Sequence, residues 1–169
     1  MTAPRGAALR APSVGGIDSA LARNIPVFQP TKMRTEETRD LFASLGPEAA
    51  IVFAYGRILP PSLLEVPPRG CINIHASLLP AYRGAAPIQW AIARGETETG
   101  VTTMLMDEGL DTGDMLLRRA TPIGPQETAV DLAARLSRIG AELIVETLER
   151  LDEIVPEPQD DRAATLAPS

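Results

Sequence analysis

The sequence is poor in the residues that build disulfides and metal sites. Its 169 residues include one cysteine, Cys71, and one histidine, His75. One cysteine cannot form an internal disulfide, and one Cys with one His cannot complete a zinc site from this chain alone. No apolar run approaches the roughly 18 residues that a membrane span requires. These absences favour a reducing, cytoplasmic setting and disfavour secretion and membrane residence.

The charge balance is acidic and uneven along the chain. Sixteen basic and 22 acidic side chains give a formal net charge of −6. An acidic chain is a poor electrostatic match for nucleic acid, so its surface is not expected to capture RNA or DNA by charge alone. Residues 122–169 carry four basic and ten acidic side chains, whereas residues 1–40 carry six and four. A polyanionic partner is therefore expected to contact the N-terminal part.

The hydrophobic pattern predicts strands that alternate with helices. Strands are expected at residues 25–28, 49–55, 71–75, 101–106 and 115–120, and helices at residues 17–23, 35–45, 86–94 and 128–151. The apolar run at 49–55 is typical of a strand covered on both faces, as in a parallel sheet. The alternation predicts an α/β fold with a mainly parallel sheet. Residues 157–169 are polar and lack periodicity, which indicates a linker or tail.

Two polar residues stand at the end of the predicted strand 71–75, whose sequence is CINIH. Asn73 and His75 are two positions apart, so their side chains share one face of the strand. Open α/β sheets bind ligands at such strand ends. An amide donor beside an imidazole suits acyl transfer, because the amide can stabilise an oxyanion while the imidazole moves protons. The alternative interpretation is an Asn that caps a turn and a structural His.

A second cluster, Asp107-Glu108-Gly109-Leu110-Asp111-Thr112-Gly113, follows the predicted strand 101–106. If this turn folds near His75, one of its carboxylates can orient the imidazole and stabilise its protonated form. The alternative is an acidic turn that only faces solvent.

The segment 77–89 reads SLLPAYRGAAPIQ and is unusual for a simple connection. Exposed leucines there would offer a surface for a flat apolar ligand. The alternative is a loop tucked back into the core. Arg83 in this segment is expected either to anchor the loop or to face an anionic ligand.

Two long segments, CINIHASLLPAYRGAAPIQWAI and ETGVTTMLMDEGLDTGDMLL, resemble the methionyl-tRNA formyltransferase family, within the wider group of folate-dependent formyltransferases. The similarity runs from about Arg5 to Pro168. It implies a Rossmann-like catalytic domain in residues 1–155, with its opening βαβ unit missing. Residues 156–169 would then begin a linker to an absent C-terminal domain.

The resemblance assigns roles to particular residues. It implies that Asn73, His75 and Asp111 are catalytic. AYGRILP, at residues 54–60, is similar to one wall of the family's folate pocket. A contact with the acceptor end of transfer RNA is implied for Arg5, and the anionic ligand considered for Arg83 would be the same transfer RNA end. The residues implied to bind folate come from the loop after the CINIH strand and from the acidic turn: Ser77, Leu78, Leu79, Pro80, Asp107, Glu108, Gly109 and Leu110.

The implied activity is transfer of a formyl group from 10-formyltetrahydrofolate to the amino group of initiator methionyl-tRNA, without a metal, in translation initiation. The resemblance also implies a cytoplasmic enzyme of one-carbon metabolism that is monomeric at full length. One alternative is a formyltransferase acting on another amine, such as glycinamide ribonucleotide or an amino sugar. The other is an inactive truncated fragment that keeps part of the folate site.

Overall fold

The computed structural model describes residues 15–56 and 58–169, and these fall into two compact units that divide between residues 32 and 33. The first unit contains helix α1 (Gly15–Ala22), which confirms the helix expected at 17–23. The strand expected at 25–28 is wrong, because these residues form no strand. Pro26 lies within this segment and Pro30 follows it, and proline cannot donate a hydrogen bond to a strand ladder.

The second unit is built on a four-stranded sheet in the order β1-β2-β3-β4. Its strands are β1 (Ala50–Val52), β2 (Cys71–His75), β3 (Glu98–Leu105) and β4 (Met115–Pro122). β1 pairs with β2 in parallel, whereas β2 with β3 and β3 with β4 are antiparallel. The α/β class is confirmed, but the sheet is mixed rather than mainly parallel. The connection at residues 106–114 is too short for the crossover that parallel neighbours need.

Three helices of this unit begin within one residue of their expected starts at 35, 86 and 128. α2 (Glu36–Ser44) starts after Thr35, whose side chain accepts from the backbone N–H of Thr38. α5 (Ala129–Glu149) starts after Thr128, and Thr128 and Asp131 form a reciprocal capping box. Two shorter helices, α3 (Pro61–Leu64) and α4 (Pro87–Ala93), have proline in their first turn, where its missing N–H costs no hydrogen bond.

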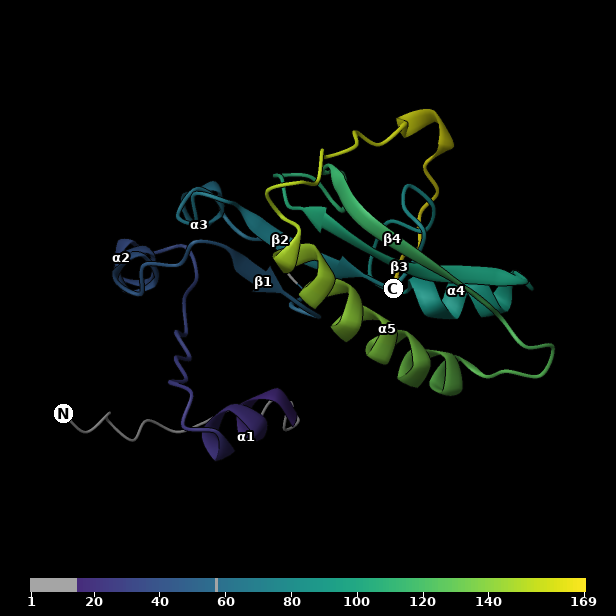
Figure 1. The fold of residues 1–169 in the computed structure, drawn as a ribbon, viewed down its shortest axis with the longest axis horizontal. Helices are drawn as coiled ribbons and strands as arrows, with labels where there is room; N and C mark the ends of the chain where they lie inside the picture. Colours follow the sequence, from purple (N-terminus) through teal and green to yellow (C-terminus); the bar gives the residue numbers. More distant parts are fainter. Residues whose placement is uncertain (1–14, 57) are drawn as a thin grey trace. The chain divides into compact units, whose positions relative to one another are not determined.

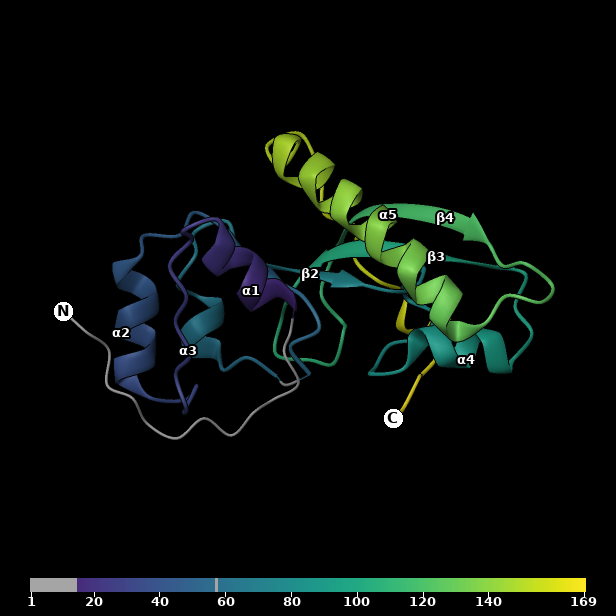
Figure 2. The same cartoon turned by 90° about the horizontal axis from the view of Figure 1, so that it is seen from below.

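Helix α5 covers one face of the sheet, as the crossing of α5 over β3 and β4 in Figures 1 and 2 shows. Its apolar stripe of Leu132, Leu136 and Leu143 is buried against Val101 of β3. The helix approaches the sheet closely at Gly140, where a Cβ atom would lie 3.0 Å from the Ile74 side chain. The opposite face of β2 and β3 is therefore the one left for a ligand site.

The C-terminal segment lies along the sheet rather than apart from it. Glu157 and Met115 exchange backbone hydrogen bonds of 2.8 and 2.9 Å, and Leu166 forms a bridge with Arg83. A short 3-10 helix, η1 (Asp161–Ala163), lies between these contacts. The division into residues 1–155 and 156–169 stays a prediction. Within the described part of the chain, no helix is long and apolar enough to cross a membrane.

Candidate active site

Asn73 and His75 lie on the face of β2 that is turned away from α5. Across the antiparallel pair, Asn73 is opposite Met104 and His75 is opposite Thr102. Ile74, between them, packs on the α5 side. The period-two prediction is therefore confirmed: both polar side chains share one face, and both line the same cavity.

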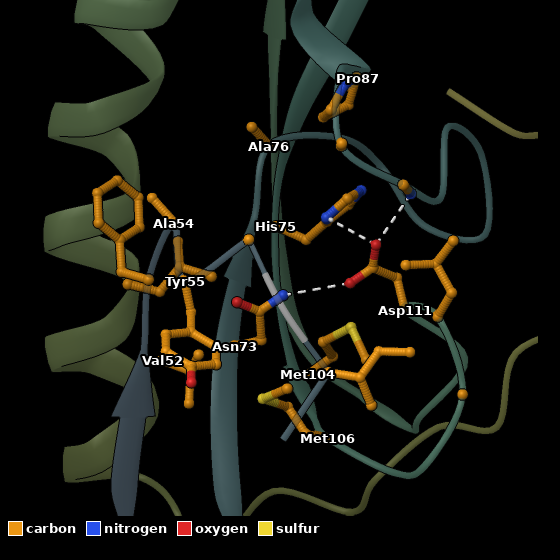
Figure 3. Close-up of a pocket in the computed structure, with 18 of the residues that line it drawn as sticks. Val52, Ala54, Tyr55, Asn73, His75, Ala76, Pro87, Met104, Met106 and Asp111 are labelled. Carbon is orange, nitrogen blue, oxygen red and sulfur yellow. Dashed lines mark hydrogen bonds and ion pairs between the residues drawn. The ribbon is translucent and has the colours of Figure 1, made fainter. Parts of the chain in front are cut away.

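The turn between β3 and β4 brings Asp111 to these two residues (Figure 3). Within the turn, the Asp107 carboxylate accepts from the Gly109 N–H at 2.9 Å and from the Thr112 hydroxyl. Asp111 has a left-handed backbone, with φ of 53°. Non-glycine residues seldom adopt this conformation. The turn is thus folded by its own side chains in a way that points one carboxylate at the sheet.

The Asp111 carboxylate has three partners. Its Oδ2 lies 3.6 Å from His75 Nδ1 and accepts from the Gly84 N–H at 2.9 Å. Its Oδ1 accepts from the Asn73 amide at 3.4 Å. The side chain of His75 is 6% exposed and that of Asp111 is 16% exposed. Low exposure weakens solvent screening, so the electrostatic effect of this carboxylate on its neighbours is stronger than that of a surface carboxylate.

The contact at His75 Nε2 fixes which ring nitrogen carries a hydrogen. Nε2 lies 2.8 Å from the backbone carbonyl oxygen of Tyr82. A carbonyl can only accept, so Nε2 must carry a hydrogen. Nδ1 is then the nitrogen that gains or loses a proton, and it faces the Asp111 carboxylate. The two ring nitrogens therefore face different groups, a backbone carbonyl at Nε2 and a carboxylate at Nδ1.

These polar groups stand on one side of a cavity of about 530 Å³. Figure 3 shows Val52, Ala54 and Tyr55 across the cavity from Asp111, with Met104 and Met106 between them. An apolar, partly aromatic wall beside a few convergent polar groups is the usual form of a site for a flat organic ligand. The predicted wall is confirmed as cavity lining, since Ala54, Tyr55, Gly56 and Ile58 all border it. Arg57 lies outside the described residues.

The residues expected to bind folate divide into two groups. Asp107, Gly109 and Leu110 line the cavity, whereas Glu108 does not. The segment Ser77–Pro80 does not line it either. The expectation of exposed leucines is wrong for Leu79, which is 1% exposed. Contact between this segment and folate stays a prediction.

The loop after β2 is folded back onto β3 by hydrogen bonds. Thr102 is fully buried; its hydroxyl accepts from the Leu79 N–H at 3.1 Å and donates to the Ser77 carbonyl at 2.7 Å. The Leu79 side chain packs between Met104 and Met115. The loop is thus part of the core on the site side of the sheet.

The two arginines expected to contact transfer RNA differ in what the structure describes. Arg83 is 6% exposed, and its guanidinium donates to Gln159 at 2.9 Å and to Asp161 at 2.8 Å. This burial favours loop anchoring over contact with an anionic ligand. Arg5 lies outside the described residues. A contact of either arginine with transfer RNA stays a prediction.

Several site groups escaped the sequence analysis. The Tyr82 carbonyl and the Gly84 N–H belong to the backbone, so no residue type signals their roles. Gln159 comes from the segment expected to be a tail. Cys71 is buried, and this burial raises the pKa of its thiol, which disfavours the reactive thiolate.

Comparison with known proteins agrees with this geometry. The chain is 55% identical over 166 residues to methionyl-tRNA formyltransferase from Trichlorobacter lovleyi, covering 97% of this chain and 52% of that protein. It is 59% identical over 152 residues to methionyl-tRNA formyltransferase from Synechococcus sp., covering 88% of this chain and 47% of that protein. The chain thus spans about half the length of the curated relatives it matches.

A solved structure and a family model point the same way. The formyltransferase PseJ from Anoxybacillus kamchatkensis, in complex with UDP-4,6-dideoxy-4-formamido-L-AltNAc and tetrahydrofolate, superposes with a TM-score of 0.72. The identity is 25%, and the match covers 93% of this chain and 82% of that chain. A model of the formyl transferase family matches residues 6–148. Because this match spans most of the sequence, the chain belongs to the formyl transferase family.

Proposed function

We propose that this protein transfers a formyl group from 10-formyltetrahydrofolate to the α-amino group of methionyl-tRNA. The observation that carries the proposal is the Asp111 carboxylate, which lies within reach of both the Asn73 amide and His75 Nδ1 at the wall of one cavity. The choice among formyltransferases rests on relatives at 55–59% identity that are named methionyl-tRNA formyltransferase.

The cavity suits a folate as formyl donor. Its apolar and aromatic wall at Val52–Tyr55 fits the flat pterin ring, and the turn residues Asp107, Gly109 and Leu110 stand at its border. A carboxylate and backbone amides near such a ring can pair with its polar edge. The PseJ structure contains tetrahydrofolate, which supports the same class of donor here.

The first step is attack by the neutral amine of methionine on the formyl carbon. A C–N bond forms, and the formyl oxygen takes up negative charge. The Asn73 amide has two N–H groups, of which one faces Asp111, so the other can donate to this oxyanion. A protonated His75 adds positive charge beside it.

The second step breaks the bond between the formyl carbon and N10 of the folate. The attacking amine must lose a proton, and N10 must gain one. His75 Nδ1 is the ring nitrogen free for this transfer, directly or through a water molecule, because Nε2 is held by the Tyr82 carbonyl. Asp111 keeps the ring in place and balances the charge of the imidazolium.

Transfer RNA is the proposed partner, and the proposed setting is the cytoplasm, in translation initiation and one-carbon metabolism. Arg5 and Arg83 remain the proposed contacts with the acceptor end, and a monomer is the proposed state at full length. An amino-sugar acceptor is the second candidate, because PseJ was solved with a formamido sugar nucleotide. The third is folate binding without formyl transfer, because the apolar wall of the cavity suits a flat ring by itself.

The proposal is tested with the purified chain in two measurements. Calorimetry measures binding of 10-formyltetrahydrofolate. A second assay follows transfer of a radiolabelled formyl group to methionyl-tRNA, with an amino-sugar nucleotide as the competing acceptor. We expect binding and transfer to the transfer RNA, both absent in a heat-denatured control. Transfer to the sugar alone supports the second candidate, binding without transfer supports the third, and no binding refutes a folate site.

A further inference from the structure

Residues 157–168 form a continuous band against the active-site loops, and we name this segment the C-terminal strap. Its first residue, Glu157, pairs with Met115 at the start of β4. At its other end, the Pro168 carbonyl accepts a hydrogen bond of 2.8 Å from the Trp90 indole N–H. In Figure 1 the strap is the yellow segment that runs from the end of α5 past β4 towards α4. Between these ends it contacts both loops that hold the catalytic groups.

Gln159 bridges those two loops with all of its side-chain polar atoms. Its amide nitrogen donates to the carbonyl of Asp111 at 2.9 Å and to the carbonyl of Gly113 at 2.7 Å. Its amide oxygen accepts from Arg83 Nε at 2.9 Å. One side chain therefore ties the turn that carries Asp111 to the loop of residues 80–86.

The strap also holds the two left-handed residues on which the catalytic geometry depends. Tyr82 has φ of 62° and Asp111 has φ of 53°. Tyr82 presents the carbonyl that binds His75 Nε2, and its own N–H donates to the Thr165 hydroxyl at 2.8 Å. Asp111 is held through its carbonyl by Gln159. Non-glycine residues keep this backbone conformation only where their surroundings fix it. Tyr82 and Asp111 therefore each depend on their hydrogen-bond partner in the strap.

The strap approaches the loop so closely at Gly84 that no side chain fits. Gly84 has φ of 121°, and a Cβ atom there would lie 2.8 Å from the Ala167 carbonyl oxygen. The Gly84 N–H donates to the Asp111 carboxylate at 2.9 Å. Backbone bonds from Arg83 to Thr165 and from Ala167 to Arg83, at 2.8 and 2.7 Å, hold the strap at this point. A shift of the strap would therefore displace a donor of the Asp111 carboxylate.

We propose that the C-terminal strap positions the catalytic groups, with Gln159 as a positioning residue that sets the placement of Asp111 against His75. This role rests on the proposed formyl transfer, in which His75 Nδ1 moves a proton beside Asp111. Gln159 does not line the cavity, so it acts through Asp111 rather than on a substrate. Loss of the Gln159 bridge leaves the apolar cavity wall at Val52–Tyr55 in place and disturbs the placement of Asp111 against His75.

The test compares Gln159→Ala with the matched control Gln126→Ala, since Gln126 is exposed in the connection before α5. Formyl transfer is measured as kcat and as KM for the folate donor. The imidazole nitrogens are followed by NMR, where every histidine signal belongs to His75 because the chain has one histidine. For Gln159→Ala we expect kcat to fall on the order of 10- to 100-fold, with KM for the folate within about twofold. We expect the Nδ1 and Nε2 shifts of His75 to change, while Gln126→Ala changes none of these values.

A second pair of variants tests the positioning role if the Gln159→Ala protein does not fold. Thr165→Val removes the hydroxyl that accepts from Tyr82 and keeps the side-chain shape, whereas Thr165→Ser keeps the hydroxyl. We expect the valine variant to shift the Nε2 signal of His75 and the serine variant to restore it. Fluorescence of Trp90, the one tryptophan, reports whether the strap end stays docked.

Unchanged His75 signals and kcat in Gln159→Ala and Thr165→Val would overturn the positioning role. A lowered melting temperature with unchanged His75 signals would also overturn it, because that result fits a merely structural strap. If the wild-type chain transfers no formyl group, the proposed function fails while the NMR comparison still decides the positioning role.

Discussion

The two faces of the sheet are held together by different interactions. On the α5 face, Leu132, Leu136 and Leu143 pack against Val101, and one hydroxyl pair of 2.8 Å, Thr103 with Thr147, is buried among them. On the site face, Leu79, Met104 and Met115 pack together, and buried polar side chains add directional hydrogen bonds. His75, Ser77 and Thr102 bind backbone groups of the loops, whereas Arg83 binds the side chains of Gln159 and Asp161.

This difference separates stability from function. Apolar packing is non-directional, and a core tolerates substitutions that keep volume and pattern. A buried polar network depends on the position and direction of each donor and acceptor, and loses much of its effect when one member is removed. We therefore expect changes on the α5 face to affect unfolding, and changes on the site face to affect His75 and Asp111 as well.

The largest effect on stability is expected from Leu143→Ala on the α5 face. Leu143 is 2% exposed, and removing its side chain leaves a cavity that costs about 2–5 kcal/mol. Urea unfolding measures the loss. Val145→Ala on the same helix, where the side chain is 54% exposed, serves as the control and should cost less than about 0.5 kcal/mol. Altered His75 signals in the folded Leu143→Ala protein would contradict the separation of the two faces.

The next effect concerns activity on the site face. Asn73→Ala, His75→Ala and Asp111→Ala should each lower formyl transfer about 100-fold or more, which corresponds to about 2.7 kcal/mol of transition-state stabilisation. The cause is the loss of an oxyanion donor, a proton carrier or the carboxylate that holds it. Single-turnover assays measure the rate, with Asp114→Asn in the same turn as the control. A rate near wild type for any of the three removes that residue from the mechanism.

Local sequence patterns predicted much of the sheet and the main site side chains. The alternation in CINIH placed Asn73 and His75 on one face, and β2 has the expected bounds. The hydrophobic pattern likewise predicted the helix at 128–151, which matches α5, because apolar periodicity is a property of neighbouring residues. The family resemblance then joined Asp111 to this pair, a contact across 38 positions that local pattern does not contain.

What the sequence could not predict depends on distant contacts. Leu79 in a polar-flanked loop reads as exposed, yet Thr102 draws that loop onto β3 by two hydrogen bonds. Gln159 lies in a segment without periodicity, and its bonds to two backbone carbonyls and one arginine leave no mark in the pattern. The predicted strand direction was wrong for β3 and β4. Alternating strands and helices favour parallel pairing, but the connection at residues 106–114 is too short for a parallel crossover.

A smaller effect is expected from Thr102→Val, which tests whether the site-face loop depends on a single hydroxyl. The substitution keeps the shape and leaves the Leu79 N–H and the Ser77 carbonyl buried without that partner, at a cost of about 1–3 kcal/mol. Urea unfolding and the His75 signals are both expected to change. Thr147→Val on the α5 face is the control, since Thr103 keeps contacts with Leu117. An equal cost with unchanged His75 signals in both variants would remove the distinction between the faces.

The smallest effect is the acid sensitivity of the first turn of α5. The Thr128 hydroxyl and backbone N–H bind the Asp131 carboxylate and hold its pKa below the usual value. A carboxyl group whose pKa is lowered by folding stabilises the folded state above its unfolded pKa of about 3.9, and this contribution is lost as the pH falls through the folded value. Asp131→Ala should therefore be less stable than wild type at pH 7, and the difference in the free energy of unfolding should shrink below about pH 4.

Urea unfolding of the two proteins across this pH range measures that difference. A difference that does not change with pH would mean that Asp131 acts without its charge. Because Asp131 lies at the exposed end of α5, the His75 signals should stay the same in both proteins, which confines this acid-sensitive contact to the helix end and leaves the apolar packing of that face unaffected.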